Sequence, residues 1–193
     1  LENLRFQPGE EANDEGLAKQ IASLGELYVN DAFGAAHRAH ASTAGVAKHL
    51  PAVAGFLMEK EIAYLSRVTT DPERPFVAIL GGSKVSDKLG VIANLGRRAD
   101  KLLIGGAMAF TFYKAKGVEV GASLVELDKV GEAAELLKAL GDRLVLPLDI
   151  VIALEPKVGA ITKIVPWNAI PKDMKGLDIG PATIDEFKQA LTG

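Results

Sequence analysis

The stretch that decides the fold is FVAILGGSKVSDKLG, residues 76–90. Its first five residues are apolar, as in a buried strand, and two adjacent glycines then interrupt the run. Lys84 and Lys88 follow within a segment, 84–98, whose apolar residues recur at helical spacing. We therefore predict a strand, a tight glycine turn and a helix that carries both lysines one turn apart at its start.

A glycine turn between a strand and a helix is typical of phosphate sites. Open α/β sheets bind ligands at the carboxyl ends of their strands, where the next helix presents free amides and a positive dipole end. Two lysines at that end repel each other and the dipole unless an anion is present. The sequence is not the Walker pattern, because its glycines are adjacent. A different phosphate site and a tight turn with two surface lysines both stay open.

Two further stretches repeat this theme. IGGAMAF, residues 104–110, places Gly105 and Gly106 between a predicted strand and helix, and GLDIGP, residues 176–181, is a third glycine turn after a strand. A glycine pair allows close approach of a ligand or of a neighbouring helix, and both interpretations remain. Three such turns at one end of one sheet would outline a nucleotide pocket.

Short apolar runs alternate with amphipathic segments along the whole chain. We predict strands at 1–6, 27–31, 76–80, 101–106, 143–153 and 176–180, and helices at 17–25, 55–68, 84–98, 107–117, 130–141 and from 181 onward. This alternation, with nearly continuous apolar strands, favours a parallel, doubly wound α/β sheet. The helix at 55–68 lies between Pro51 and Pro72 and is the natural connector of two lobes.

Composition excludes several classes of function. The chain has 193 residues, a net charge of −3 and 48% hydrophobic residues, so a broad nucleic-acid-binding face is not expected. It contains no cysteine, which excludes disulfides, thiolate metal sites and a cysteine nucleophile, and fits an intracellular protein. No segment reaches the roughly 18–20 apolar residues of a membrane helix.

Other kinds of site find little support in the first fifty residues. Zinc bound through His37 and His40, with His49 nearby, would need further ligands that the neighbourhood does not suggest. A hydrolase triad of Ser42, His37 and Asp31 lacks the G-x-S-x-G elbow. A Rossmann-type dehydrogenase is a third reading, but no G-x-G-x-x-G follows any predicted strand.

Two arginines suggest an acid-binding site instead. Arg5 stands in ENLRF and Arg38 in NDAFGAAHRAHAST. The planar fork of arginine suits phosphates and carboxylates, so two converging arginines would recognise an acidic ligand. The alternative is that Arg38 pairs with Asp31 and Arg5 with a loop glutamate.

The sequence resembles the phosphoglycerate kinase family over nearly its whole length. The shared motifs are LENLRF, YVNDAFGAAHRAHAST, GFLMEKE, RPFVAILGGSKVSDK, IGGAMAFTF and GLDIGP, in this order. The resemblance implies two Rossmann-like lobes joined by a hinge helix. It also implies the glycolytic transfer of a phosphoryl group from 1,3-bisphosphoglycerate to ADP, giving 3-phosphoglycerate and ATP. Residues 1–54 would be part of the 3-phosphoglycerate lobe, 55–70 the hinge helix and 71–193 part of the nucleotide lobe.

The resemblance also implies roles for single residues. Arg5 and Arg38 look like arginines of the basic patch that holds 3-phosphoglycerate, with Arg38 also catalytic. Lys88, with Lys84 beside it, looks like a lysine that reaches the nucleotide phosphates and the transferring group. The implied backbone of the nucleotide pocket comprises Gly82, Ser83, Gly105, Gly106, Gly176 and Leu177.

The family's two end segments have no counterpart here. They supply further acid-site residues, a ribose-binding glutamate and the aspartate that positions Mg²⁺, so Mg²⁺ would arrive with the nucleotide and find no protein ligand in this chain. We expect this chain to be the middle part of an enzyme of about twice its length. The complete enzyme is expected to be cytoplasmic and monomeric, without nucleic-acid or membrane partners. The alternative is a non-catalytic folding or nucleotide-binding fragment, and such an isolated chain is expected to be inactive and to self-associate. The stretch 154–171 resembles the family only loosely.

Overall fold

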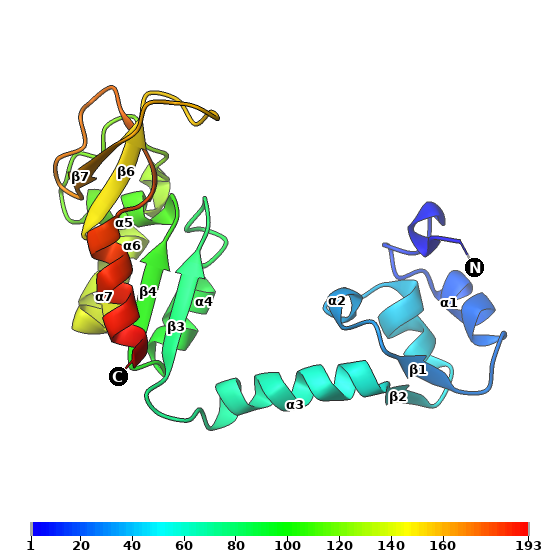
Figure 1. Ribbon diagram of the computed structural model, residues 1–193. Helices are drawn as coiled ribbons and strands as arrows, with labels where there is room; N and C mark the ends of the chain where they lie inside the picture. The colour runs from blue at the N-terminus through cyan, green and yellow to red at the C-terminus, as the bar shows by residue number, and fades with distance from the viewer. Residues whose placement is uncertain (1, 193) are drawn as a thin grey trace. The chain divides into compact units, whose positions relative to one another are not determined.

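A computed structural model describes residues 2–192 of the chain, which forms two compact units, Leu1–Glu73 and Arg74–Gly193. Figure 1 shows the elements of both units. No helix in the described part of the chain is long and apolar enough to cross a membrane. The α/β fold class with parallel sheets is confirmed.

The first unit contains a two-stranded parallel sheet and short helices. Its elements are η1 (Leu4–Phe6), α1 (Glu15–Ala22), β1 (Tyr28–Asn30), α2 (Phe33–Ala36), η2 (Ala41–Gly45), η3 (Val46–Lys48), β2 (Ala52–Ala54) and α3 (Phe56–Thr70). Strand β1 pairs with β2 in parallel, with Tyr28 opposite Ala52. The predicted strand 27–31 and helix 55–68 are thereby confirmed as β1 and α3.

The predicted strand at 1–6 is wrong, because residues 4–6 form a 3₁₀ turn. The side chain of Asn3 accepts a hydrogen bond from Arg5 N at 3.0 Å, and Gln7 N donates to Leu4 O at 2.9 Å. Asparagine commonly bonds to its own backbone in this way and so competes with extended structure. The apolar residues of LENLRF therefore do not indicate a strand.

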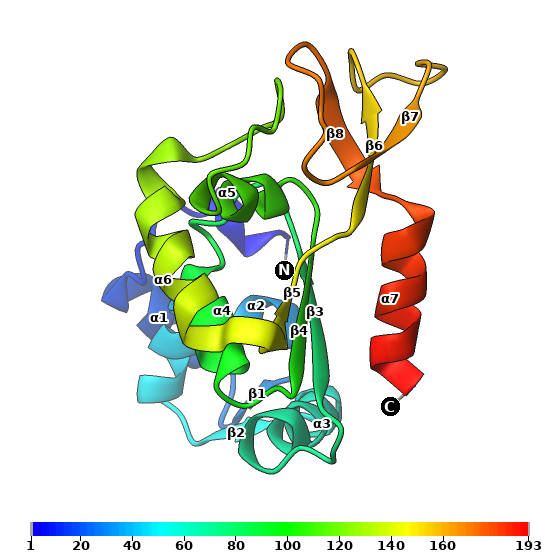
Figure 2. The ribbon, with the colours of Figure 1, turned by 90° about the vertical axis from the view of Figure 1, so that its left-hand side faces the viewer.

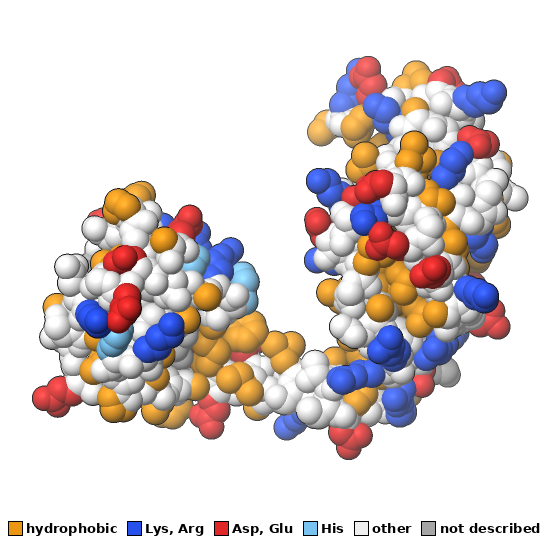
Figure 3. All heavy atoms as spheres, turned by 180° about the vertical axis from the view of Figure 1, so that it is seen from behind, with side chains coloured by type: hydrophobic (Ala, Val, Ile, Leu, Met, Phe, Trp, Pro, Cys, Tyr) orange, Lys and Arg blue, Asp and Glu red, His pale blue; other side chains and the backbone are white. Residues whose placement is uncertain are grey.

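Little apolar surface is buried in the first unit. Its buried hydrophobic residues are Ala18, Ala22, Ala41, Val46 and Met58. The apolar side chains of α3 lie mostly at the surface, with Phe56 88% and Leu57 63% exposed. Figure 3 shows hydrophobic side chains gathered over the first half of this helix.

The second unit is built on a three-stranded parallel sheet, in the order β3-β4-β5. Its elements up to that sheet's end are β3 (Val77–Gly81), α4 (Leu89–Gly96), β4 (Lys101–Gly105), α5 (Met108–Ala115), η4 (Leu127–Lys129), α6 (Val130–Leu140), η5 (Gly141–Arg143) and β5 (Leu144–Val145). The predicted strands at 76–80 and 101–106 and the helices at 107–117 and 130–141 are confirmed.

The predicted continuous strand at 143–153 is wrong, because the parallel strand ends at Val145, shortly before Pro147. Pro147 has no amide to donate, and its carbonyl accepts the Tyr113 hydroxyl at 2.5 Å. Leu148 N donates to Thr183 Oγ1 at 2.9 Å instead of to a strand. Beyond this break the chain enters a separate antiparallel sheet, which the sequence did not indicate.

That second sheet has the order β7-β6-β8. Its elements, with the last helix, are β6 (Asp149–Ala153), β7 (Lys163–Pro166), β8 (Lys175–Ile179) and α7 (Pro181–Thr192). The predicted strand at 176–180 and the helix from 181 are confirmed. The third glycine turn therefore does not lie on the sheet that carries the other two.

Helices cover both faces of the parallel sheet, as Figure 2 shows. On one face, Leu102 and Ile104 of β4 pack into the main core with residues of α4, α5 and α6. On the other face, Leu103 packs against Phe187 and Ala190 of α7. Successive residues of one strand thus point to opposite buried layers, as expected for a doubly wound sheet.

Candidate functional site

Two glycine turns lie side by side at the carboxyl edge of the parallel sheet. Gly81 of β3 is paired with Gly105 of β4, so the chain leaves the sheet at the same level in both strands. Gly106 has φ +71°, and a Cβ on it would lie 2.7 Å from Gly82 O, so only glycine fits where the turns touch. Met108 N donates to Gly82 O at 3.0 Å, which bonds the first turn to the start of α5.

The lysine-bearing segment that follows is a turn rather than the start of a helix. Helix α4 begins at Leu89, and Lys88 N donates to Val85 O at 2.9 Å in a bond over three residues. The first helical bond is Ile92 N to Lys88 O, at 2.8 Å. The prediction that Lys84 and Lys88 share the first helical turn is therefore wrong: Lys84 precedes the turn and Lys88 is the N-cap residue of α4.

A carboxylate from a distant loop holds this turn in place. Glu126 Oε2 accepts hydrogen bonds from Val85 N at 2.5 Å and Ser86 N at 3.0 Å, and Oε1 accepts from Ser86 Oγ at 2.6 Å. These bonds satisfy amides before the helix and keep the segment in a turn. The hydroxyl and amide of Ser86, together with the amide of Val85 and the charge of Lys84, hold the pKa of Glu126 below its usual range.

Sequence reasoning missed Glu126. It lies 40 residues from Ser86 in the chain, and the stretch LVELDK that contains it has no motif of its own. A carboxylate that pairs with backbone amides leaves no pattern in composition or periodicity. Only the fold brings it to the turn.

The turn keeps groups that can meet an anion. Gly82 and Lys88 are partly buried, while Ser83 and Lys84 are exposed. Within residues 2–192 neither lysine forms an ion pair, and the amides of Ser83 and Lys84 donate no hydrogen bond. Two cations and free amides next to a helix N-terminus are the groups that a phosphate needs.

Of the two residues expected from the third glycine stretch, Leu177 lies next to the glycine turns and Gly176 does not. Gly176 lies inside β8, not in a turn, and a Cβ there would clash with the Phe110 ring of α5. Its amide donates to Ser123 Oγ at 2.9 Å. Leu177, next in the strand, lines a small hollow together with Gly106 and Phe110. The structure thus brings Leu177 and Gly106 together, whereas Gly176 serves the packing of Phe110.

The two predicted acid-site arginines both lie in the first unit. Arg5 is in η1, and its Nε lies 3.9 Å from Glu11 Oε1, an exposed pair with a loop glutamate. Arg38 follows α2, and its Nη1 donates to Gly34 O at 3.3 Å. The alternative pairing of Arg38 with Asp31 is absent from the described residues.

The segments that follow the two arginines are bonded to each other through Glu10. This carboxylate is 3% exposed and accepts Ser42 N at 3.0 Å and the Ser42 hydroxyl, while His40 Nδ1 lies 3.6 Å away. The backbone adds a bond from Ala41 N to Glu10 O at 3.0 Å. A buried carboxylate with several partners is a strong local link.

The hydrolase and zinc alternatives find no support in these contacts. The Ser42 hydroxyl donates to Glu10, and Asp31 Oδ1 accepts Leu57 N at 2.7 Å and Met58 N at 3.0 Å, so neither engages a histidine. Over residues 2–192 no group of three or more His, Asp or Glu side chains is placed to hold a metal ion. The described residues therefore do not fit a protein-held metal.

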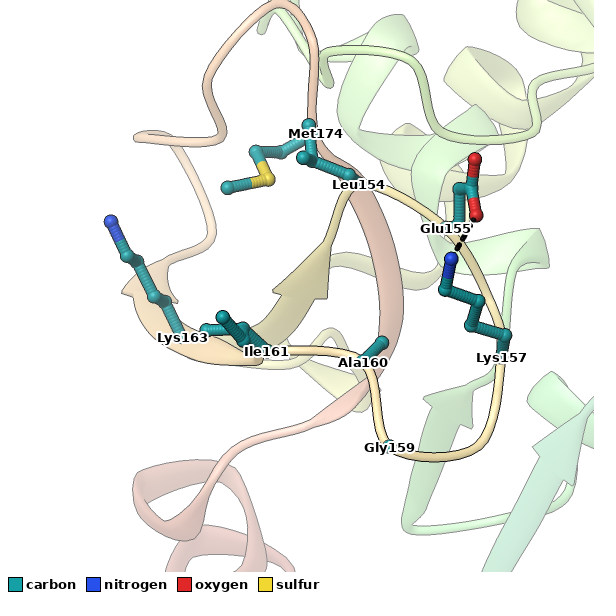
Figure 4. Close-up of a pocket in the computed structure, with 8 residues that line it drawn as sticks. All are labelled: Leu154, Glu155, Lys157, Gly159, Ala160, Ile161, Lys163 and Met174. Carbon is teal, nitrogen blue, oxygen red and sulfur yellow. Dashed lines mark ion pairs between the residues drawn. The ribbon is translucent and has the colours of Figure 1, made fainter.

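A separate hollow of about 500 Å³ lies under the hairpin arm between β6 and β7 (Figure 4). Its lining is mainly apolar, and it includes Ile161, Met174 and Lys163, the last of which points outward in the figure. Lys157 is already paired with Glu155 at 2.8 Å. None of the lining residues belongs to the glycine turns, and no polar groups converge in the hollow, so we do not assign the site here.

Comparison with known proteins identifies relatives that match nearly the whole chain. The sequence profile of phosphoglycerate kinase matches residues 1–193. The chain is 60% identical over 191 residues to the phosphoglycerate kinase of Rubrobacter xylanophilus and 59% identical over 196 residues to that of Thermus thermophilus. These matches cover 99% and 100% of the chain but only 49% and 50% of the relatives.

Solved structures agree with the sequence relatives. The phosphoglycerate kinase of Coxiella burnetii superposes with a TM-score of 0.86 at 39% identity, over 97% of this chain and 49% of that one. The Pyrococcus horikoshii enzyme gives a TM-score of 0.83 at 31% identity, over 98% and 51%. The chain spans about half the length of the relatives it matches. It belongs to the phosphoglycerate kinase family.

Proposed function

We propose that the complete protein to which this chain belongs is a phosphoglycerate kinase. It would transfer a phosphoryl group reversibly between 1,3-bisphosphoglycerate and ADP, giving 3-phosphoglycerate and ATP. The observation that carries this proposal is the pair of touching glycine turns at the carboxyl edge of the parallel sheet, followed by the turn with Lys84 and Lys88.

The second unit would bind the nucleotide. The exposed Ser83 and Lys84 amides and the two lysine side chains support contacts to its phosphates. On the nucleoside side we propose contacts with Gly106 and Leu177, which lie next to each other. Phosphoryl transfer needs in-line positioning and positive charge on the transferring oxygens, and Lys88 is proposed to supply that charge.

The first unit would bind 3-phosphoglycerate through Arg5 and Arg38. Both side chains hold only weak partners, an exposed pair at 3.9 Å and a carbonyl at 3.3 Å, so an acidic ligand can replace these contacts at little cost. The Glu10 bonds link the two arginine-bearing segments and support their joint use. We propose helix α3, which covers most of the segment 55–70, as the hinge.

The partners follow from this reaction. Magnesium would arrive with ADP or ATP and neutralise phosphate charge, since the residues described here do not form a carboxylate cluster for it. We propose a monomeric cytoplasmic enzyme, without nucleic-acid or membrane partners, consistent with the net charge of −3.

The test is the turnover of the complete protein with Lys88→Ala. Because removing one charge-stabilising contact commonly costs a few kcal/mol of barrier, we expect the turnover rate to fall about 100-fold or more while the melting temperature stays unchanged. Lys138→Ala, on the exposed face of α6, is the matched control and should leave the rate intact. A Lys88→Ala rate within a factor of a few of the wild type would contradict the assignment.

A second candidate concerns the 193-residue chain on its own. We propose that it binds ADP without catalysing the reaction, since it spans about half the length of its relatives. Calorimetric titration with ADP and a steady-state assay for 1,3-bisphosphoglycerate formation test this directly. Measurable turnover by the purified chain would refute the non-catalytic reading.

A further inference from the structure

The turn next to the proposed phosphate site is hydrogen-bonded to a residue that no motif indicates. The Glu126 carboxylate accepts three hydrogen bonds from Val85 and Ser86, the two residues that directly follow Lys84. Hydrogen bonds to an ionised carboxylate are roughly twice as strong as neutral ones. Glu126 thereby fixes the backbone on which both lysines are mounted.

The same residue is anchored at its other end. Glu126 N donates to Thr111 Oγ1 at 3.2 Å, and Thr111 belongs to α5 and is 1% exposed. Helix α5 begins directly after the Gly105–Gly106 turn, and Met108 at its start is bonded to Gly82. The lysine turn and both glycine turns are therefore tied to one helix, on one side by Glu126 and on the other by Met108.

The contact also decides which amides remain for a ligand. A carboxylate and a phosphate compete for the same donors. Glu126 takes the amides of Val85 and Ser86, whereas the amides of Ser83 and Lys84, on the glycine side, and that of Asp87 donate no hydrogen bond within the described part of the chain. An anion next to the glycines can therefore meet the amides of Ser83 and Lys84 without competing with Glu126.

We propose that Glu126 is a positioning residue for nucleotide binding. It holds the 84–88 turn so that Lys84 and Lys88 present their charge to the phosphates bound at the Gly82–Ser83 turn. The proposal rests on the proposed kinase function, because it assigns the phosphates to this turn. Glu126 touches neither substrate nor reacting atoms; it acts through the backbone of residues 85 and 86.

The experiment measures steady-state kinetics of the complete kinase with Glu126→Gln, Lys84→Ala and the double variant. Glu126→Gln removes the carboxylate charge that orients the turn. We expect this to raise the KM for ADP about tenfold, which corresponds to about 1.4 kcal/mol. The KM for 1,3-bisphosphoglycerate should not move. Because Glu126 acts through the turn that carries Lys84, the two substitutions should be non-additive in KM for ADP.

Glu119→Gln provides the matched control, because Glu119 is an exposed carboxylate paired with Lys114 at 2.7 Å and lies outside the turn. Hydrogen exchange of the Val85 and Ser86 amides shows whether the contact is lost in Glu126→Gln. Faster exchange with an unchanged KM for ADP, or fully additive effects with Lys84→Ala, would overturn the proposal. A wild-type protein without kinase turnover would instead overturn the proposed function, and the two failures are distinguishable.

Discussion

The two units of this chain hold their structure by different means. The second unit buries a continuous core in which Phe112, Tyr113, Leu102 and Ile104 are almost inaccessible to solvent. The first unit buries chiefly alanines, Val46 and Met58, and it relies on carboxylates that bond to backbone amides. The hydrophobic effect grows with the apolar area buried, so the second unit has much the larger driving force for folding.

This difference bears on the function. The proposed nucleotide contacts rest on strands and helices that a packed core fixes, as a precise site requires. The proposed acid contacts, Arg5 and Arg38, sit on short turns joined by Glu10. We therefore expect the nucleotide contacts to be the better preorganised of the two in the isolated chain.

Paired phenylalanine substitutions sharpen the comparison most strongly. Phe112→Ala removes a fully buried ring from the second unit and should lower the free energy of unfolding by about 3–5 kcal/mol. Phe56→Ala removes a ring that is 88% exposed in the first unit and should change it by less than about 0.5 kcal/mol. Urea unfolding of the 193-residue chain measures both. An equal decrease in the free energy of unfolding in both variants would show that the two units do not differ in their cores.

A carboxylate also matters in the second unit, at the start of α7. Although burial opposes ionisation of Asp149, hydrogen bonds from the hydroxyl and amide of Thr183 and from Ala182 N outweigh it and lower the pKa of Asp149. A pKa lowered by folding adds stability above the unfolded value of about 3.9, and this is lost as the pH falls through the lowered folded value.

Asp149→Asn should accordingly lower the free energy of unfolding at pH 7 by about 1–3 kcal/mol, because donors at Thr183 would then face an amide. The gap between wild type and variant should narrow as the pH falls below about 4. Urea midpoints at pH 7 and pH 3 provide the measurement. A gap that stays constant with pH would contradict the role of the charge.

A smaller effect is expected at the cap of α3 in the first unit. Asp31 Oδ1 accepts the amides of Leu57 and Met58, so Asp31→Ala should cost about 1 kcal/mol and speed hydrogen exchange at both amides. Glu61→Ala, exposed on the same helix, is the control and should not change the exchange at residues 57 and 58. Unchanged exchange in Asp31→Ala would mean that the unit does not depend on this carboxylate.

The elements that have a local pattern of apolar residues could be predicted from the sequence. Strands β3 and β4 are apolar runs ended by glycine, and α5 and α6 follow them with helical spacing, so local pattern and final structure agree. Two of the three glycine turns were predicted at the correct edge of the parallel sheet for the same reason, because parallel strands end together, whereas the third stretch belongs to the antiparallel sheet. The geometry of the lysine turn could not be predicted in this way, since it depends on Glu126.

The break at Pro147 has the same physical cause as the geometry of the lysine turn, a contact between residues far apart in the sequence. The break at Pro147 is set by partners in α5 and α7, Tyr113 and Thr183, that are remote in sequence. Side-chain bonds over long sequence separations leave no periodic signal, so a single sequence cannot reveal them.

The most direct test of the central claim is a map of where ADP touches the chain. Titrating the isotope-labelled 193-residue protein with ADP, while recording backbone amide spectra, locates the nucleotide without requiring turnover. We predict shifts at the amides of residues 82–84, 105–106 and 177, with the hairpin arm at 154–163 unaffected. Shifts confined to that arm, or none at the glycine turns at saturating ADP, would contradict the account.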